Sequence, residues 1–197
     1  MTMRAAVGSD AAAQAAHGHD AVVSAGRLLA LAPGGRPSIL AGLAEPFDRL
    51  AAPAGLLAPL RLPHFLAQAA HETDGFRTLV EYGGPGWFAR YDGRADLGND
   101  RPGDGARYRG RGVFQLTGRA NYRRYGRLLG VDLEGEPAQA AEPELSLRIA
   151  LAYWRERGID AAADRDDIVA VTRLINGGLN GLAARRALLE RARAIWP

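Results

Sequence analysis

Apolar residues recur three and four positions apart in six segments of the chain, the spacing that places them on one face of an α-helix. No segment alternates apolar and polar residues over the length of a β-strand. Asp164 precedes the fifth of these segments and is expected to be the N-cap of its helix. The pattern predicts an all-α fold, with helices over residues 38–50, 61–73, 118–129, 142–157, 165–175 and 182–195.

The chain has 197 residues, of which 47% are hydrophobic and 24% are charged, so its composition is that of an ordinary globular domain. We expect residues 20–197 to form a single domain and the Ala-rich residues 1–19 to form a flexible N-terminal extension. The absence of cysteine excludes disulfides, zinc–thiolate sites and a cysteine nucleophile.

No apolar run reaches the roughly 18–20 residues of a membrane span. Gly18, His19 and Asp20 stand where a signal peptide would need its apolar core. We therefore expect no membrane insertion, and a protein made in the cytoplasm that reaches a cell wall by a separate export or lysis route.

Residues 81–112 contain nine of the 25 glycines, together with Pro85 and Pro102, and are expected to form a long loop. Connections longer than about 12–15 residues in a compact domain are usually functional, so this loop is predicted to line a groove. A floppy insertion is the alternative interpretation. Against it, the segment is rich in aromatic residues suited to stacking on sugar rings or bases: Tyr82, Trp87, Phe88, Tyr91 and Tyr108.

Glu72 lies near the apolar face of the predicted helix over residues 61–73. Partial burial there would favour the protonated form of the carboxyl group, which a general acid needs near neutral pH. Gln68, one turn earlier, and the adjacent His71 could orient it by hydrogen bonds. An exposed glutamate at a helix end is the other interpretation that the pattern allows.

Glu81 is a second candidate carboxylate, nine residues after Glu72. In an unbroken helix the two would lie on opposite faces, about 13 Å apart along the axis. Gly75 allows the helix to end between them, so the chain could turn and bring Glu81 across a groove. A separation of about 6.5–9.5 Å would suit an inverting glycosidase and about 5–5.5 Å a retaining one, and the sequence leaves both open.

Residues 108–122, YRGRGVFQLTGRANY, resemble the signature of glycoside hydrolase family 19, the chitinase family that also includes many phage endolysins. The resemblance extends from about residue 62, through AHETDGF at 70–76, to INGGLNGL at 175–182, and so covers about two-thirds of the chain. It implies a lysozyme-like α-helical fold split by a substrate groove, and inverting hydrolysis of β-1,4 bonds between N-acetylated sugars. It implies neither a metal nor another cofactor.

The resemblance also suggests roles for individual residues. Glu72 matches the general acid, Glu81 the general base, and Thr117 the residue that helps to hold the attacking water. Arg185 would fix a catalytic carboxylate. The remaining candidates form a substrate-binding set: Gln68, His71, Tyr108, Gln115, Asn121, Asn176 and Arg185.

Three of these residues have plain alternatives. Thr117 could cap the helix that follows it, and Asn176 could simply end a helix before Gly177. A zinc role for His71 is disfavoured, because a metalloprotease helix would need a second histidine where Gly75 stands.

The substrate is predicted to be a polysaccharide. Compact members with short loops are similar to bacterial or phage enzymes that act on peptidoglycan, which favours peptidoglycan over chitin, the alternative. A net charge of +3, carried by 25 arginines and no lysine, would add a modest attraction to an anionic wall. A non-catalytic sugar-binding protein on the same fold would lack one of the carboxylates. A nucleic-acid-binding module is disfavoured, because the arginines are spread over all segments. We expect a monomer.

Overall fold

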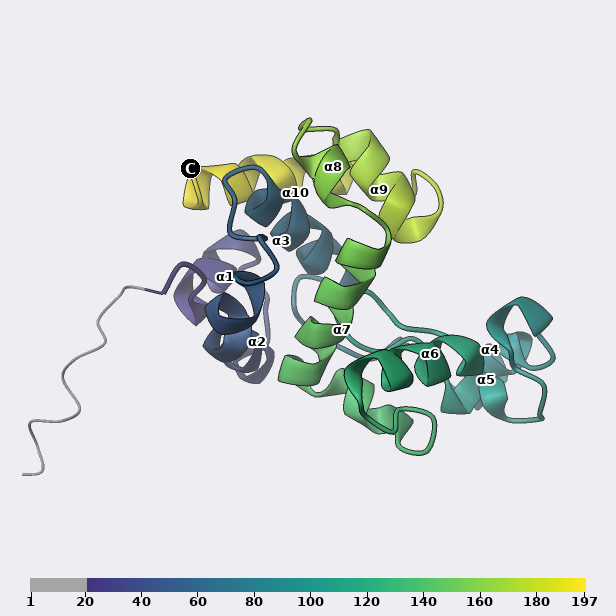
Figure 1. The fold of residues 1–197 in the computed structure, drawn as a ribbon. Helices are drawn as coiled ribbons and strands as arrows, with labels where there is room; N and C mark the ends of the chain where they lie inside the picture. Colours follow the sequence, from purple (N-terminus) through teal and green to yellow (C-terminus); the bar gives the residue numbers. More distant parts are fainter. Residues whose placement is uncertain (1–20) are drawn as a thin grey trace, which may run out of the picture.

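A computed structural model describes residues 21–197, so the extension predicted over residues 1–19 lies outside the described residues. The described chain is built of α-helices and short 3₁₀ turns (Figure 1). The elements are α1 (Ala25–Leu31), α2 (Pro37–Ala51), α3 (Arg61–Glu72), α4 (Pro85–Phe88), η2 (Ala89–Tyr91), η3 (Ala95–Leu97), α5 (Asp104–Arg107), α6 (Arg119–Leu129), η4 (Pro137–Ala141), α7 (Pro143–Glu156), α8 (Asp160–Ala163), α9 (Ile168–Asn176) and α10 (Leu182–Ile195). Over this range β pairing is limited to two isolated bridges, Val80 with Arg111 and Arg111 with Leu116.

The six helices predicted from the apolar spacing are all present, as α2, α3, α6, α7, α9 and α10. One boundary was wrong. The N-cap of α9 is Asp167, whose carboxylate accepts hydrogen bonds from the backbone N–H groups of Val169 and Ala170. Asp164 instead ends α8 and pairs with Arg61 at 2.7 Å. The separate turn of α8 and the positive φ of Asp166 move the start of α9 three residues along the chain.

Two hydrophobic clusters form the interior. The larger lies among α1, α2, α3 and α7–α10 and includes Phe65 and Trp154, whose ring centroids are 5.3 Å apart. The smaller lies around α6 and consists of Tyr108, Leu116, Tyr122, Tyr125, Leu133, Ala140 and Ile149. Helix α7 contributes Trp154 to the first cluster and Ile149 to the second. Figure 1 shows α7 running between the end of the molecule that holds α1–α3 and the end that holds α4–α6.

The glycine-rich segment is folded, and the expectation of one long loop is corrected in this respect. It contains α4, η2, η3 and α5, all of them short. Asn99 fastens it by donating to the Tyr91 carbonyl and accepting from the Arg119 N–H, each at 2.9 Å. A buried ion pair between Asp104 and Arg119 joins it to α6. These contacts exclude a floppy insertion.

Helix α3 occupies the centre of the larger cluster, and its residues 62–70 are all buried. Helix α10 packs along it, and Arg185 of α10 donates a hydrogen bond to the buried Gln68 of α3. None of the helices in residues 21–197 combines the length and the apolar character that a membrane span requires.

Candidate active site

Glu72 is the last residue of α3, with 18% of its side chain exposed. Its Oε1 lies 2.5 Å from Nη2 of Arg185, a residue of α10 whose side chain is 2% exposed. The chain reverses directly after Glu72, because Asp74, Gly75 and Phe76 all have positive φ. The helix thus ends before Gly75, as the sequence predicts, and the chain is free to lead to Glu81.

A buried polar chain holds Arg185 in place. Its Nη1 donates to Oε1 of Gln68, and its Nε donates to the carbonyl of Asn180 at 3.2 Å. Gln68 in turn donates to Oγ1 of Thr172 on α9 at 3.5 Å. Gln68 is fully buried. The prediction that Gln68 binds substrate is therefore corrected: on the buried face of α3 it contacts Arg185 and Thr172, behind Glu72.

His71 points to a different part of the surface. It lines a separate hollow of about 330 Å³ together with Arg77 and Arg191. A Cβ at Gly181 would lie 2.4 Å from its ring, so the imidazole packs against the bare α-carbon of that glycine. Burial, and then the nearby charge of Arg185, lower the pKa of His71. His71 is adjacent to Glu72 in the sequence, but it lines a different hollow from the one that Gln115, Asn121 and Asn176 line.

Glu81 is held by a larger set of donors, with 20% of its side chain exposed. Its Oε2 accepts the N–H of Gly110 at 2.9 Å, and its Oε1 accepts the Tyr91 hydroxyl at 2.9 Å. Nε1 of Trp87 lies 3.4 Å and Nη2 of Arg90 lies 3.5 Å from the same Oε1. Sequence reasoning did not identify these donors, although the aromatic content of the glycine-rich segment signalled that it mattered.

Gly110 brings Glu81 and Gln115 together. Its carbonyl accepts the Glu81 N–H at 2.8 Å. A Cβ built on Gly110 would stand 2.7 Å from Oε1 of Gln115 and 3.2 Å from Oε2 of Glu81. The close approach of both side chains therefore requires glycine at this position.

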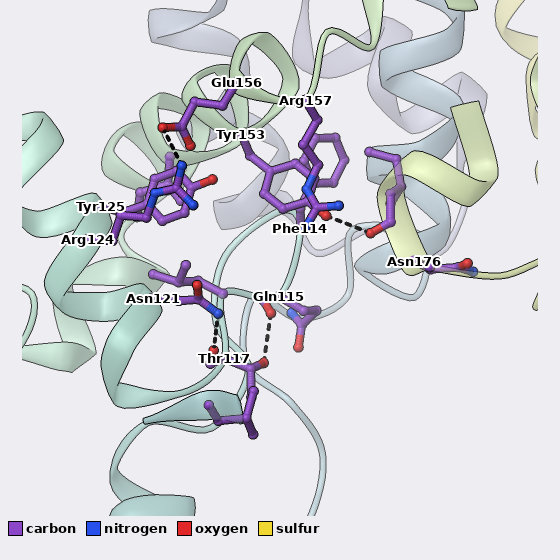
Figure 2. A pocket seen from close by; sticks show the side chains of 15 residues that line it. Phe114, Gln115, Thr117, Asn121, Arg124, Tyr125, Tyr153, Glu156, Arg157 and Asn176 are labelled. Atoms are coloured by element: carbon purple, nitrogen blue, oxygen red, sulfur yellow. Dashed lines mark hydrogen bonds and ion pairs between the residues drawn. The ribbon is translucent and has the colours of Figure 1, made fainter. Parts of the chain in front are cut away.

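The amides and Thr117 line one cavity of about 640 Å³, shown in Figure 2. The Thr117 hydroxyl donates to the Gln115 carbonyl, and Asn121 Nδ2 donates to the Thr117 carbonyl, each at 2.8 Å. Thr117 is not a helix cap, because the N-cap of α6 is Gly118 and no side chain caps this helix. Asn176 does end α9, and it also lines the cavity. The cavity thus brings together Gln115, Thr117, Asn121 and Asn176.

Each carboxylate is linked to this cavity by contacts. Glu81 reaches it through Gly110 and Gln115. Glu72 reaches it through Arg185 and Asn180, whose carbonyl also accepts a hydrogen bond from Asn176 at 3.0 Å. The cavity itself is lined by residues of both hydrophobic clusters, such as Leu116 of the smaller and Ile175 of the larger. The site therefore lies where the two halves of the molecule meet.

Tyr108 is not part of the cavity, which corrects its prediction as a substrate-binding residue. It is 1% exposed, packs against Tyr122 with ring centroids 5.4 Å apart, and donates its hydroxyl to the Glu134 carbonyl at 3.1 Å. The aromatic residue that opens the motif thus supports the smaller cluster.

Among residues 21–197 there is also no group of three or more side chains arranged to hold a metal ion.

Comparisons with known proteins agree with this architecture. The glycoside hydrolase family 19 model, described as "Chitinase class I", matches residues 60–171. A Haemophilus influenzae protein named for a glycosyl hydrolase family 19 domain is 30% identical over 177 residues, covering 76% of this chain and 86% of its own. The basic 30 kDa endochitinase of Solanum lycopersicum is 31% identical over 150 residues, covering 58% of this chain and 44% of its own. The chain therefore spans less than half the length of that plant relative.

Solved structures share the fold. Chitinase C from Streptomyces griseus HUT6037 superimposes with a TM-score of 0.73 at 22% identity, over 91% of this chain and 95% of its own. The class IV chitinase of Zea mays superimposes with a TM-score of 0.63 at 19% identity, over 89% of this chain and 92% of its own.

Proposed function

The chain belongs to glycoside hydrolase family 19, and from this premise we propose that it cleaves β-1,4 bonds between N-acetylated sugars with inversion at the anomeric carbon. Glu72 acts as the general acid and Glu81 as the general base. The observation that carries the proposal is that two carboxylates from separate segments, each held by its own donors, are linked by contacts to one amide-lined cavity.

The donors around each carboxylate suit its role. The N–H of Gly110 and the hydroxyl of Tyr91 both donate to the carboxyl group of Glu81 and hold it in the fixed position that a general base needs to take a proton from water. Glu72 becomes a carboxylate when it gives its proton to the leaving oxygen. Arg185 is already in place to stabilise that carboxylate as it forms.

Thr117 and the amides bind water and sugar. The Thr117 hydroxyl donates to a backbone carbonyl, which leaves its lone pairs able to accept a hydrogen bond from the attacking water. Gln115, Asn121 and Asn176 can donate to and accept from sugar hydroxyls and N-acetyl groups.

The substrate that we propose is the glycan of bacterial peptidoglycan. In support, the net charge is +3 and every cationic side chain is an arginine, which favours an anionic polymer. Chitin is the second candidate, since the tomato relative is named an endochitinase and the similar Streptomyces structure a chitinase. A non-catalytic binding protein is disfavoured, because both carboxylates are present with their donors.

The test compares purified protein on peptidoglycan sacculi and on soluble chitin oligosaccharides. Products are identified by mass, and the newly formed anomer is followed by NMR. We expect sacculi to dissolve with release of the inverted anomer. Cleavage of chitin alone would replace the proposed substrate, a retained anomer would refute the role of Glu81 as a base, and no cleavage of either would refute the enzyme proposal.

Substitution of the acid tests its role directly. We expect Glu72→Gln to lower kcat by about 10²–10⁴-fold while sugar binding survives, because the amide keeps the shape but has no proton to give. Glu45→Gln, a change at an exposed residue of α2, is the control and should leave kcat unchanged. Undiminished hydrolysis by Glu72→Gln would show that another group is the acid.

A further inference from the structure

Three charged residues line the cavity: Arg124, Glu156 and Arg157. Arg124 and Glu156 neutralise each other, with Nη2 of the arginine 3.0 Å from Oε1 of the glutamate. Arg157 forms no ion pair with any residue of 21–197, and its side chain makes a single hydrogen bond there, to the Leu174 carbonyl at 3.3 Å. The cavity wall thus presents one positive charge without a carboxylate.

Arg157 is nevertheless held in a definite position. It follows the last residue of α7, and its guanidinium lies over the ring of Tyr153, 4.6 Å from the centroid. Tyr153 is itself anchored, because its hydroxyl donates to the Ile175 carbonyl at 2.8 Å. Figure 2 shows the guanidinium over this ring, between the side chains of Glu156 and Asn176 in that view. Among the described residues only Nη1 of Arg157 has a hydrogen-bond partner, so its other N–H groups can donate to a ligand.

Arg157 is linked to the proposed acid by a short series of contacts. It donates to the Leu174 carbonyl of α9, and Asn176 at the end of that helix shares the Asn180 carbonyl with Arg185. Glu72 already has Arg185 as its partner at 2.5 Å. Arg157 is therefore connected to the acid through α9 and Arg185, and Glu72 does not need it as a partner.

We propose that Arg157 is a specificity-determining residue that binds a carboxylate carried by the glycan. This inference rests on the proposed function and refines its substrate class to peptide-free strands of the peptidoglycan glycan, whose ether-linked lactyl groups end in free carboxylates. Where a stem peptide is attached, the same carboxyl is in an amide bond and carries no charge. A guanidinium holds a carboxylate by two parallel N–H···O bonds, and these charge-assisted bonds are stronger than those to a neutral group. Neutral chitin offers no such partner.

The experiment uses two forms of one substrate, so that only the charge differs. Peptide-free glycan strands from peptidoglycan are prepared with free lactyl carboxylates, and a second portion has these carboxylates converted to methyl amides. The wild-type protein should have a kcat/KM about tenfold or more higher on the carboxylate form. Arg157→Gln should abolish this preference by lowering kcat/KM on the carboxylate form to the value on the amide form.

Arg155→Gln is the matched control. Arg155 is exposed on the same last turn of α7 and does not line the cavity, so this variant loses the same charge elsewhere. The Arg155→Gln variant should keep the full preference for the carboxylate form. Loss of the preference in both variants would mean that net charge, and not the position of Arg157, is responsible, and would overturn the inference.

Three further outcomes are decisive. If Arg157→Gln lowers kcat/KM equally on both forms, Arg157 serves the reaction and not recognition of the carboxylate. If the wild type shows no preference, the inference is wrong. Should the wild type cleave neither form, the proposed function fails. Titration of both strands into Glu72→Gln, with and without Arg157→Gln, then still measures whether Arg157 prefers the carboxylate.

Discussion

Glu72 and Glu81 depend on different kinds of support. Glu81 takes its donors from its own neighbourhood, namely Tyr91 and the backbone of Gly110. Glu72 depends on Arg185, which comes from α10, more than one hundred positions later in the chain. Arg185 in turn depends on Gln68, so the orientation of the proposed acid is set by a residue that never meets the solvent.

We predict that Gln68→Met lowers both stability and activity. Methionine fills similar space but leaves a buried guanidinium N–H without its acceptor, which costs about 1–3 kcal/mol in the free energy of unfolding. Because Arg185 then loses one of its anchors, kcat should also fall, with KM less affected. Urea unfolding and steady-state kinetics measure the two effects.

Thr172→Val is the graded comparison. The bond from Gln68 to Thr172 is long, at 3.5 Å, so its loss should cost less than the loss of the Gln68 acceptor. Equal losses in Thr172→Val and Gln68→Met would show that the long bond to Thr172 matters as much as the acceptor that Gln68 offers to Arg185.

The sequence offers the two carboxylates as candidates but does not indicate the residues that hold them in the structure. Glu72 is recognisable from its place on an amphipathic helix and from the motif around it. The hydrogen bond from Tyr91 to Glu81 depends on how α4 and η2 fold back, which no local spacing encodes. The prediction that Tyr108 binds substrate was wrong for the same reason. Tertiary packing decides whether an aromatic residue of the motif faces the groove or the interior, and Tyr108 is buried.

Helices and their ends differ in how well the sequence predicts them. The apolar period marks α2, α3 and α10 within a few residues, because their buried faces are long. The start of α9 was misplaced because two aspartates, Asp164 and Asp167, both suit an N-cap, and only the intervening turn decides between them. Turns that depend on a close contact, such as the one after α9, are visible in sequence only as glycines.

That turn offers a test at the level of one element. Gly181 and Gly177 both have positive φ, at 72° and 77°, but a Cβ at Gly181 would lie 2.4 Å from the His71 ring, whereas Gly177 has open space around it. Gly177→Ala should therefore cost only the backbone strain, about 1–2 kcal/mol. Gly181→Ala should cost more, and thermal unfolding of the two variants measures the difference. Equal losses would show that His71 moves aside freely.

At the scale of the whole molecule, a network of charges borders the smaller hydrophobic cluster. Glu134 pairs with Arg123 at 2.7 Å and with Arg119 at 3.4 Å, and Arg119 also pairs with the buried Asp104. Hydrogen bonds from Arg123, opposed in part by burial, lower the pKa of Glu134 to about 2. Acid should therefore weaken the half of the molecule that is built on α6.

The sign of the pH effect follows from that shift. The pKa of Glu134 rises from about 2 in the folded state to its ordinary value of 4.5 on unfolding, so its contribution to stability is full above 4.5 and is lost as the pH falls toward 2. Glu134→Gln should be less stable than wild type at neutral pH, with the difference shrinking over this window. Glu144→Gln, which breaks an exposed pair with Arg49, should show little difference at any pH. Thermal unfolding between pH 2 and pH 7 compares the three proteins, and a constant gap for Glu134→Gln would contradict the assignment.

Helix α7 belongs to both hydrophobic clusters and also supplies Tyr153 to the cavity wall. A substitution on its inner faces therefore affects both hydrophobic clusters at once. For protein engineering this separates two kinds of position. Leu97, which the glycine-rich segment contributes to the cavity, can be varied to reshape one wall, whereas α7 joins the two halves and should be the last helix to be redesigned.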